Sequence, residues 1–261
     1  MNSEDGRRTI RSVERAITIL EQLSRTQPTP PSSLSDRIDL TPGAIHTQLA
    51  TLQQNGYVTN DDGEYSLGPQ LLTIGRRVRN SHPLYEAGRE EVDKLADETG
   101  ECAHAIIEFD GQRVPLYEAF GQNAVGTELY QKKQERPQNL LHCTASGKAL
   151  LSTFPDERVE QFLDIEDLRR LTDRTITDPD TLFEELETIR ERGYATNDEE
   201  EIHGIRAIGV PIHGPNGRPV GALSVSGPTS RLEGSFFEEE LPERLLYAQN
   251  VVEINLQTSP T

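Results

Sequence analysis

The sequence predicts an α+β protein with an N-terminal winged helix-turn-helix domain, a linking helix and a C-terminal domain of antiparallel strands and helices. The first observation is the stretch PSSLSDRIDLTPGAIHTQLATLQQNGYV at residues 31–58, which reads as a short helix, a tight turn and a longer capped helix. The second is a series of alternating strands and short helices after residue 100, including LHCTASGKALL at 141–151. A chain of 261 residues is long enough for two separate cores.

The N-terminal domain begins with a predicted helix at about residues 10–25. Ser12 is its expected N-cap, and apolar residues follow at helical spacing, namely Ile10, Val13, Ile17, Leu20 and Leu23. The prolines of TQPTPP at 26–31 end this helix, because proline lacks an N–H group and clashes with the preceding turn. A short second helix is expected at 32–38.

The third helix is the one expected to contact DNA bases. Thr41 caps it and Pro42 takes the first helical position, while Ile45, Leu49 and Leu52 form its apolar side and Asn55-Gly56 ends it. The second helix of a helix-turn-helix pair lies in the major groove, with its first turns nearest the bases. The predicted DNA-binding residues lie there and at the start of the preceding helix: Ser32, Ser33, Thr41, Pro42, Gly43, Ala44, His46, Thr47 and Gln48.

A strand–turn–strand wing is expected at 57–67, because the Asp62-Gly63 pair is a strong hairpin signal. The tip of this wing is acidic, whereas wings that enter minor grooves usually carry arginine or lysine. The alternative interpretation is that the winged helix serves as a protein-interaction or dimerisation module.

A linking helix is predicted at 70–80, with Gly75 in its middle as a candidate hinge. Its apolar side is Leu71, Leu72, Ile74 and Val78, and its arginines at 76, 77 and 79 either contact phosphates or pair with the acidic C-terminal domain. His82-Pro83 marks the boundary. The expected domains are therefore 1–68, the linking helix 69–82, and 83–261 for effector binding and oligomerisation.

The C-terminal domain is expected to contain five helices and several strands. The helices are placed at 84–99, 144–152, 157–163, 181–192 and 236–256. The strands are placed at 101–109, 113–119, near 123–130, and in a hairpin of 205–212 with 220–226. This arrangement is compatible with a sheet that holds a ligand on one face.

Charge is distributed unevenly along the chain. Residues 1–80 hold nine basic and nine acidic residues, whereas residues 81–261 hold 17 and 35 and so supply the whole net charge of −18. A segment that approaches phosphates cannot carry such an acidic surplus, so the asymmetry favours a DNA-facing N-terminal third. Excess acid together with only four lysines indicates a surface adapted to high salt, as in a halophilic archaeon; the alternative is an ordinary acidic protein.

The sequence points to the cytoplasm. No stretch approaches 18 uninterrupted apolar residues, and the first residues, MNSEDGRRTI, lack the apolar core of a signal peptide. The two cysteines, Cys102 and Cys143, do not form a disulfide framework. We therefore expect no membrane partner.

Several blocks occur together in an order and spacing that mark a known family. They read IRSVERAITILEQLSR, SSLSDRIDLTPGAIHTQLATLQQNGYV, YSLGPQLLTIG, LHCTASGKALL, RERGYATNDEEEIHGIRAIGVPI and GALSVSGPTSRL. Through them the chain resembles the isocitrate lyase regulator (IclR) family over nearly its full length. The resemblance implies a winged helix-turn-helix joined to a GAF-like effector-binding domain, and homodimers or dimers of dimers on palindromic DNA operators.

The resemblance also implies a site for a small organic effector, usually a carboxylate or aromatic acid. The residues that would line it are His142, Thr144, Ala145, Ser146, Asn197, Ile205, Arg206, Ala207, Ser224 and Ser226. Two of them depart from the family, which often has Cys at the position of Ala207 and Asp at that of Asn197. These departures bear on the identity of the effector.

The residues support such a site by themselves. With Thr144 as N-cap, the N–H groups of 145–147 are expected to be free for an anion. Ser224 and Ser226 share one face of a strand, so both hydroxyls can point at one ligand. The alternative is ordinary helix capping and a polar sheet face.

Other chemistry is not expected. Cys102 with His104, and His142 with Cys143, do not have the spacing of a zinc site, and the His142-Cys143 pair lacks a third orienting residue for nucleophilic catalysis. The acidic run at 198–201 is interpreted as a solvated loop. No phosphate-binding glycine loop appears, so neither a cofactor nor a metal is expected.

The sequence therefore predicts a DNA-binding transcription regulator, not an enzyme, whose operator affinity is controlled by a small organic or sugar acid from a catabolic route. Two alternatives stay open at this point. One is a protein that processes small molecules and uses the winged helix only for assembly, and the other is a redox sensor that uses Cys102 or Cys143.

Overall fold

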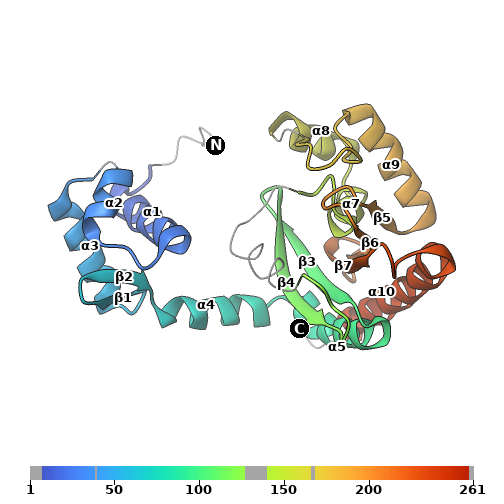
Figure 1. The fold of residues 1–261 in the computed structure, drawn as a ribbon, viewed down its shortest axis with the longest axis horizontal. Coiled ribbons are helices and arrows are strands. Elements are labelled where there is room, and N and C mark those ends of the chain that lie inside the picture. Colours follow the sequence, from blue (N-terminus) through green and yellow to red (C-terminus); the bar gives the residue numbers. More distant parts are fainter. Residues whose placement is uncertain (1–7, 39, 127–139, 166–167, 259–261) are drawn as a thin grey trace. The chain divides into compact units, whose positions relative to one another are not determined.

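The computed structural model describes residues 8–38, 40–126, 140–165 and 168–258. The chain divides into two compact units, Met1–Arg79 and Asn80–Thr261. Figure 1 shows helices and a small hairpin in the first unit, and a sheet covered by helices in the second.

The first unit is a winged helix-turn-helix. Its elements are α1 (Arg11–Thr26), α2 (Pro31–Arg37), α3 (Pro42–Gln54), β1 (Val58–Asp61), β2 (Glu64–Leu67) and α4 (Pro69–Asn80). The hairpin turns at Asp62 and Gly63, whose φ angles are 49° and 89°, as the Asp-Gly pair predicts. The first strand extends further than predicted, because β1 continues through Asn60 and Asp61, whereas β2 spans the expected residues. The core consists of Ile19, Leu23, Leu34, Ile38, Ile45, Leu49, Leu52, Val58 and Tyr65.

The wing is fastened to the connection between α1 and α2. Thr29 and Tyr65 exchange two backbone hydrogen bonds of 2.9 Å, and the N–H of Leu67 donates to Gln27 Oε1 over 2.7 Å. Thr29 is buried, so this contact closes one end of the core. The wing is therefore held in place by the segment that precedes the helix-turn-helix.

Helix α1 differs from its prediction in two ways. Ser12 is not the N-cap: the helix begins at Arg11, and Ile10 occupies the cap position without a side-chain hydrogen bond. Of the expected apolar face only Leu23 is fully buried, while Ile10, Val13 and Ile17 are 65%, 52% and 50% exposed. The core instead takes Ile19, which was not in the expected set. Apolar residues lie along two sides of this helix, and their spacing alone does not predict which side packs in the core.

The second unit is built around a five-stranded antiparallel sheet in the order β4-β3-β7-β6-β5. Its strands are β3 (Cys102–Phe109), β4 (Gln112–Phe120), β5 (Ala195–Asp198), β6 (Ile205–His213) and β7 (Pro219–Pro228). The helices are α5 (Pro83–Thr99), α7 (Ala145–Leu151), α8 (Asp156–Ile165), α9 (Pro179–Arg192), a π-helical turn η1 (Phe236–Glu240) and α10 (Leu241–Thr258). Sequentially distant β3 and β7 lie side by side in the middle.

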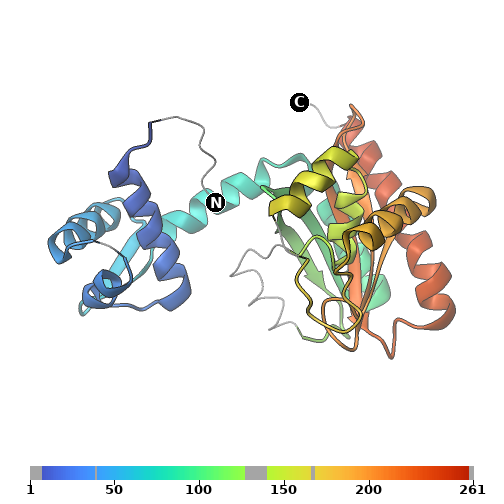
Figure 2. The ribbon, with the colours of Figure 1, turned by 90° about the horizontal axis from the view of Figure 1, so that it is seen from above.

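The two faces of the sheet are covered by different helices (Figures 1 and 2). Helices α5 and α10 pack against alternating apolar residues such as Ala103, Val210 and Leu223. Helices α7, α8 and α9 form a second core with Ile106, Ala195 and Ala222 on the other side. Because side chains alternate across a strand, the residues between the first set point toward α7.

Most predicted elements of this unit are confirmed, with two exceptions. Residues 123–126 form a turn and coil instead of the start of a strand, and the rest of that expected strand, 127–130, lies outside the described residues. Strand β5 was not predicted. It has only four residues, ATND, and three of them are polar, so it carries little strand signal of its own.

The sheet and α7 meet at Gly209 in β6. A Cβ atom at this glycine would lie 2.6 Å from the carbonyl carbon of Ala145 and 2.8 Å from the backbone nitrogen of Ser146. Such distances are far shorter than any van der Waals contact, so only glycine permits this approach. The start of α7 therefore rests directly on the middle of the sheet.

We expect Gly209→Ala to destabilise the second unit by about 1–3 kcal/mol, because the added methyl must push α7 off the sheet. Chemical denaturation of the full chain followed by circular dichroism measures the loss. Gly75→Ala is the control and should cause no loss of stability, since a Cβ there meets no atom within 4 Å outside its own stretch of helix. Equal stability of Gly209→Ala and wild type would contradict this, because it would show that α7 and β6 can move apart without a measurable cost in free energy.

Candidate functional site

The exposed side of α3 carries the residues predicted to read DNA. Thr41 Oγ1 accepts a hydrogen bond of 3.3 Å from the Ala44 N–H and so starts the helix, with Pro42 at the first position. Gly43, His46 and Thr47 are exposed, and Ala44 and Gln48 are half-buried. The opposite side, with Ile45 and Leu49, is fully buried. Because one side of α3 is buried in the core, the opposite side of its first two turns faces solvent.

The elements beside α3 have different character. In the first turn of α2, Ser32 is exposed and Ser33 is half-buried. At the tip of the wing Asp61, Asp62 and Glu64 are all exposed. A negative tip is repelled by phosphates, so this wing is not built for insertion into a minor groove.

In the second unit, strand register brings several predicted effector residues onto one surface. Ser224 pairs with Gly209 on one side and with His104 on the other, and Ser226 pairs with Ala207. Directly paired residues of antiparallel strands point to the same side. Because Gly209 touches α7, this whole surface faces α7. We call it the polar face, and its members are His104, Asn197, Ala207, Gly209, Ser224 and Ser226.

A chain of hydrogen bonds crosses the polar face from strand β4 to strand β7. Glu118 Oε1 lies 2.9 Å from His104 Nδ1, and His104 Nε2 lies 3.0 Å from Ser226 Oγ. His104 is fully enclosed, and its burial lowers the pKa of the imidazole, although the neighbouring Glu118 opposes this shift. Arg113 favours the neutral ring as well, while Glu201 opposes it. His104 and Glu118 were missed from the sequence as site residues, although a histidine inside the apolar strand CAHAII is a visible signal.

Arg113 was also missed. It comes from β4, and its Nε donates over 3.3 Å to Ser146 Oγ at the start of α7. It forms no ion pair with any described residue, although the chain has 44 acidic residues. A half-buried guanidinium without a carboxylate partner is a group suited to bind an anion.

Other predicted effector residues have partners within the protein. His142 Nε2 lies 3.1 Å from the carbonyl oxygen of Arg169, and Arg206 is engaged by Asp198, the Leu232 carbonyl and the Phe237 ring. Ile205, next to Arg206, begins strand β6 and is half-buried.

The start of α7 offers fewer free groups than expected. Thr144 Oγ1 accepts the N–H of Gly147 over 3.1 Å, so that N–H is not available for an anion. Ala145 and Ser146, both buried, supply the remaining first-turn N–H groups.

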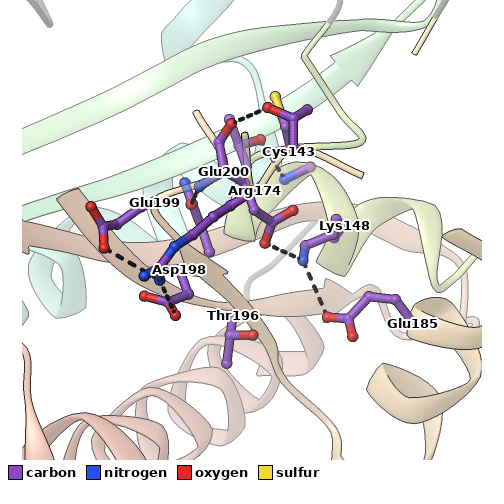
Figure 3. A network of polar contacts seen from close by, with 12 residues as sticks. Cys143, Lys148, Arg174, Glu185, Thr196, Asp198, Glu199 and Glu200 are labelled. Carbon is purple, nitrogen blue, oxygen red and sulfur yellow. Dashed lines mark hydrogen bonds and ion pairs between the residues drawn. The ribbon is translucent and has the colours of Figure 1, made fainter. Parts of the chain in front are cut away.

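The acidic run at 198–201 is not a solvated loop, which corrects the prediction. Glu200 is buried, and its Oε1 lies 2.6 Å from the ammonium of Lys148, which is only 1% exposed and also contacts Glu185 over 3.2 Å. Arg174 pairs with Asp198 and Glu199 nearby (Figure 3). Burial raises the pKa of Glu200, against the pull of Lys148. The other oxygen, Oε2, is buried without a hydrogen bond in the described structure.

The two cysteines lie inside the second unit. Both are buried and reduced, and burial raises the pKa of the Cys102 thiol to about 12. A thiol is nucleophilic and readily oxidised only as thiolate, so the position of Cys102 does not favour redox sensing. Among the described residues there is no cluster of three or more potential metal ligands, and no helix there is long and apolar enough to cross a bilayer.

Both units match models of known protein families. The model described as "IclR helix-turn-helix domain" matches residues 12–62, and the one described as "Bacterial transcriptional regulator IclR C-terminal" matches residues 76–252. Together they cover most of the chain.

Proteins of similar sequence point to the same family as the two models. A protein of Halobacterium salinarum named "Probable HTH-type transcriptional regulator ArcR" is 41% identical over 259 residues, which is 99% of this chain and 98% of that protein. The glycerol operon regulatory protein of Streptomyces coelicolor is 33% identical over 228 residues, covering 86% and 87%. The Pca regulon regulatory protein of Pseudomonas putida is 30% identical over 218 residues, covering 83% and 74%.

Solved structures show the same fold. The Thermotoga maritima IclR structure has a TM-score of 0.74 at 26% identity, covering 95% of this chain and 99% of that one. An IclR transcriptional regulator from Alicyclobacillus acidocaldarius has a TM-score of 0.76 at 22% identity, covering 96% and 99%. The fold and the exposed helix α3 are those of a winged-helix transcription regulator. The chain belongs to the IclR family, which confirms the resemblance seen in the sequence.

We expect Lys148→Met to destabilise the protein by about 3–5 kcal/mol, because it leaves the buried Glu200 carboxylate without its counter-charge. Urea denaturation at neutral pH measures the change. The control is Arg244→Met, which breaks an ion pair with Glu98 whose side chains are 38% and 56% exposed and should cost less than about 1 kcal/mol. The double variant Lys148→Met/Glu200→Met should recover much of the loss. Equal costs for both single variants would contradict this account.

Proposed function

We propose that this IclR-family transcriptional regulator binds a palindromic operator in a sequence-specific way, and that a small organic or sugar acid in its C-terminal domain controls the binding. The observation that carries the DNA-binding part is the exposed first two turns of α3, held outward by a buried opposite side. The match of residues 12–62 to the IclR helix-turn-helix supports it.

The polar face supports the effector part of the proposal. Arg113 is a cation without an ion pair among the described residues, and the Ser224 hydroxyl makes no hydrogen bond there although it is only 4% exposed. Buried polar groups usually have partners, so these groups are suited to a bound anion. Relatives named for a Pca regulon and a glycerol operon are in keeping with a small organic metabolite as effector.

We further propose that the protein acts as a homodimer or dimer of dimers in the cytoplasm. Within the first unit α1 exposes Ile10, Val13 and Ile17, and α4 exposes Leu72 and Val78 by 57% and 66%. Apolar stripes of this kind mark contact surfaces. In a dimer, residues 1–68 would read one half-site each, 69–82 would link, and 83–261 would bind the effector and oligomerise.

The alternatives weighed from the sequence receive less support. A redox sensor needs a reactive thiol, whereas Cys102 and Cys143 are buried. An assembly-only winged helix does not require the exposed, capped start of α3. Turnover of candidate acids without any DNA binding would favour a protein that processes small molecules.

We expect Gln48→Ala and His46→Ala each to weaken operator binding by about 1–3 kcal/mol and to relax base preference, because their side chains project from the first turns of α3. Genome-wide mapping of bound sites with the wild-type protein supplies the operator, and footprinting measures the variants. Gln54→Ala, at the exposed end of the same helix, is the control. If both first-turn variants footprint like wild type, another element reads the bases.

Gly75→Ala should reduce the coupling between effector and operator. Gly75 is exposed in the middle of α4, and alanine there stabilises a helix by roughly 1 kcal/mol. A stiffer linking helix should transmit less of a coupling that is typically about 1–3 kcal/mol. Operator affinity is measured with and without an acid that shifts wild-type binding. The same ratio of affinities in both proteins would eliminate a hinge at Gly75.

A further inference from the structure

Helix α3 lacks the side chains that usually read G·C base pairs. Its sequence, PGAIHTQLATLQQ, contains no lysine, arginine, aspartate or glutamate. In the major groove, guanine is read chiefly by the paired donors of arginine or lysine, and cytosine by an acidic side chain that accepts from its amino group. The base preference of α3 therefore depends on the uncharged side chains of its exposed side.

Two exposed threonines of α3 turn their hydroxyl groups back onto the helix. Thr47 Oγ1 donates to the Gly43 carbonyl oxygen and Thr51 Oγ1 to the Thr47 carbonyl oxygen, each over 3.0 Å. Hydrogen bonds of this kind select one side-chain rotamer. Guanine presents only acceptors in the major groove, so a hydroxyl whose proton is used within the helix does not donate to it. Thr47 therefore offers its methyl group to a base.

This methyl group has one matching partner among the four bases. Thymine alone carries a methyl group at its major-groove edge, and a threonine methyl reads it by apolar contact. Thr47 is exposed in the second turn of α3, and its exposed neighbours on the same side, Gly43 and Ala50, are small. Small neighbours let the helix approach a base pair closely. The position of Thr47 thus favours contact between the two methyl groups.

Gln48 selects the same kind of base pair through hydrogen bonds. Its side chain is half-buried, and its amide group makes no hydrogen bond with any described residue. A glutamine binds adenine through two hydrogen bonds, accepting from N6 and donating to N7. The neutral ring of His46 has one donor and one acceptor on separate sides, so it does not form such a parallel pair of bonds. Because adenine pairs with thymine, Thr47 and Gln48 both favour A·T pairs.

Building on the proposed function, we propose that α3 reads A·T base pairs in each half-site of the operator, with the Thr47 methyl group against a thymine methyl group and the Gln48 amide on an adenine. Both side chains touch the bases and determine specificity. The hydrogen bond from Thr47 to Gly43 keeps the methyl group, and not the hydroxyl proton, available to the DNA.

The first test identifies the base pair that Gln48 reads. Selection of binding sites from random duplex DNA with the full-length protein gives the base preference at each position, and the same selection with Gln48→Ala shows which preference is lost. We expect an A·T pair there, favoured about fivefold or more by the wild-type protein. A G·C pair at that position would overturn the proposal. So would a set of preferences that is the same in both proteins.

The second test removes the thymine methyl group alone. Replacing single thymines of the selected operator by 2′-deoxyuridine keeps base pairing but deletes this methyl group. We expect one replacement in each half-site to weaken wild-type binding about three- to fivefold, because an apolar contact is lost. In Thr47→Ser, which keeps the hydroxyl group, the same replacement should weaken binding less than about 1.5-fold, because the partner methyl is already absent. Thr47→Val, which keeps a methyl group, should retain the uracil effect.

Thr188→Ser in α9 is the matched control. Thr188 is exposed, and its Oγ1 donates to the Glu184 carbonyl oxygen over 3.0 Å, but it lies in the second unit. This variant should show the same uracil effect as the wild-type protein. The proposal is overturned by a uracil effect of equal size in wild type and Thr47→Ser, or by the lack of any uracil effect in wild type.

These outcomes are distinguishable from a failure of the proposed function. If the selection enriches no sequence, the protein does not bind DNA sequence-specifically, and the proposed function falls. If it enriches an operator whose base preferences and uracil effects are the same in Gln48→Ala, Thr47→Ser and wild type, the regulator stands and the A·T readout by α3 falls.

Discussion

The contact of α7 with Gly209 sets the geometry on which the second unit depends. Because the helix start rests on strand β6 with no side chain between, Ser146 comes within reach of Arg113 from the far strand β4. Ser224, the partner of Gly209 in β7, lies next to this contact. A larger residue at 209 would separate the helix from the polar face. The glycine thus fixes the distance across which Arg113 and the serines can share one ligand.

The buried pair of Lys148 and Glu200 holds the other side of α7. Removing two charges from water is costly, and the raised pKa of Glu200 shows that its pairing does not fully offset burial. The pair instead fixes the position of α7. Lys148 links this helix to the segment after β5 through Glu200 and to α9 through Glu185. The Thr172 and Thr175 hydroxyls donate to the backbone of that same segment. The acidic run at 198–201 therefore helps to hold α7 in place, through the ion pair of Glu200 with Lys148.

The fold followed from the sequence where local rules were decisive. The Thr41 cap, the Asp62-Gly63 turn and the glycines that end α5 and α9 each have a strong local signal, and each element formed as expected. Prediction failed where tertiary packing decides. Spacing on α1 offered two apolar stripes, and β5 has no pattern of its own.

The site was only partly predictable for a similar reason. The serines of β7 were singled out through their strand period and the family resemblance. His104, Glu118 and Arg113 come from β3 and β4, which are distant in sequence from β7 and join it only through the sheet order. No periodicity reports that His104 faces Ser226. Likewise, the burial of Glu200 depends on Lys148, more than fifty residues away, and the run of acids around it reads as a solvated surface.

The charge of the surface that we propose to contact DNA has a consequence for how the operator is found. Neither α3 nor the wing contains a lysine or arginine, and the wing tip is acidic. Few counterions are then released from the reading surface on binding, so operator occupancy changes less steeply with ionic strength than for proteins with many phosphate contacts. Weak attraction to bulk DNA also shortens each sliding excursion. With such a surface we expect the regulator to search the chromosome mainly by repeated encounters, and to keep its selectivity when the salt of its surroundings fluctuates.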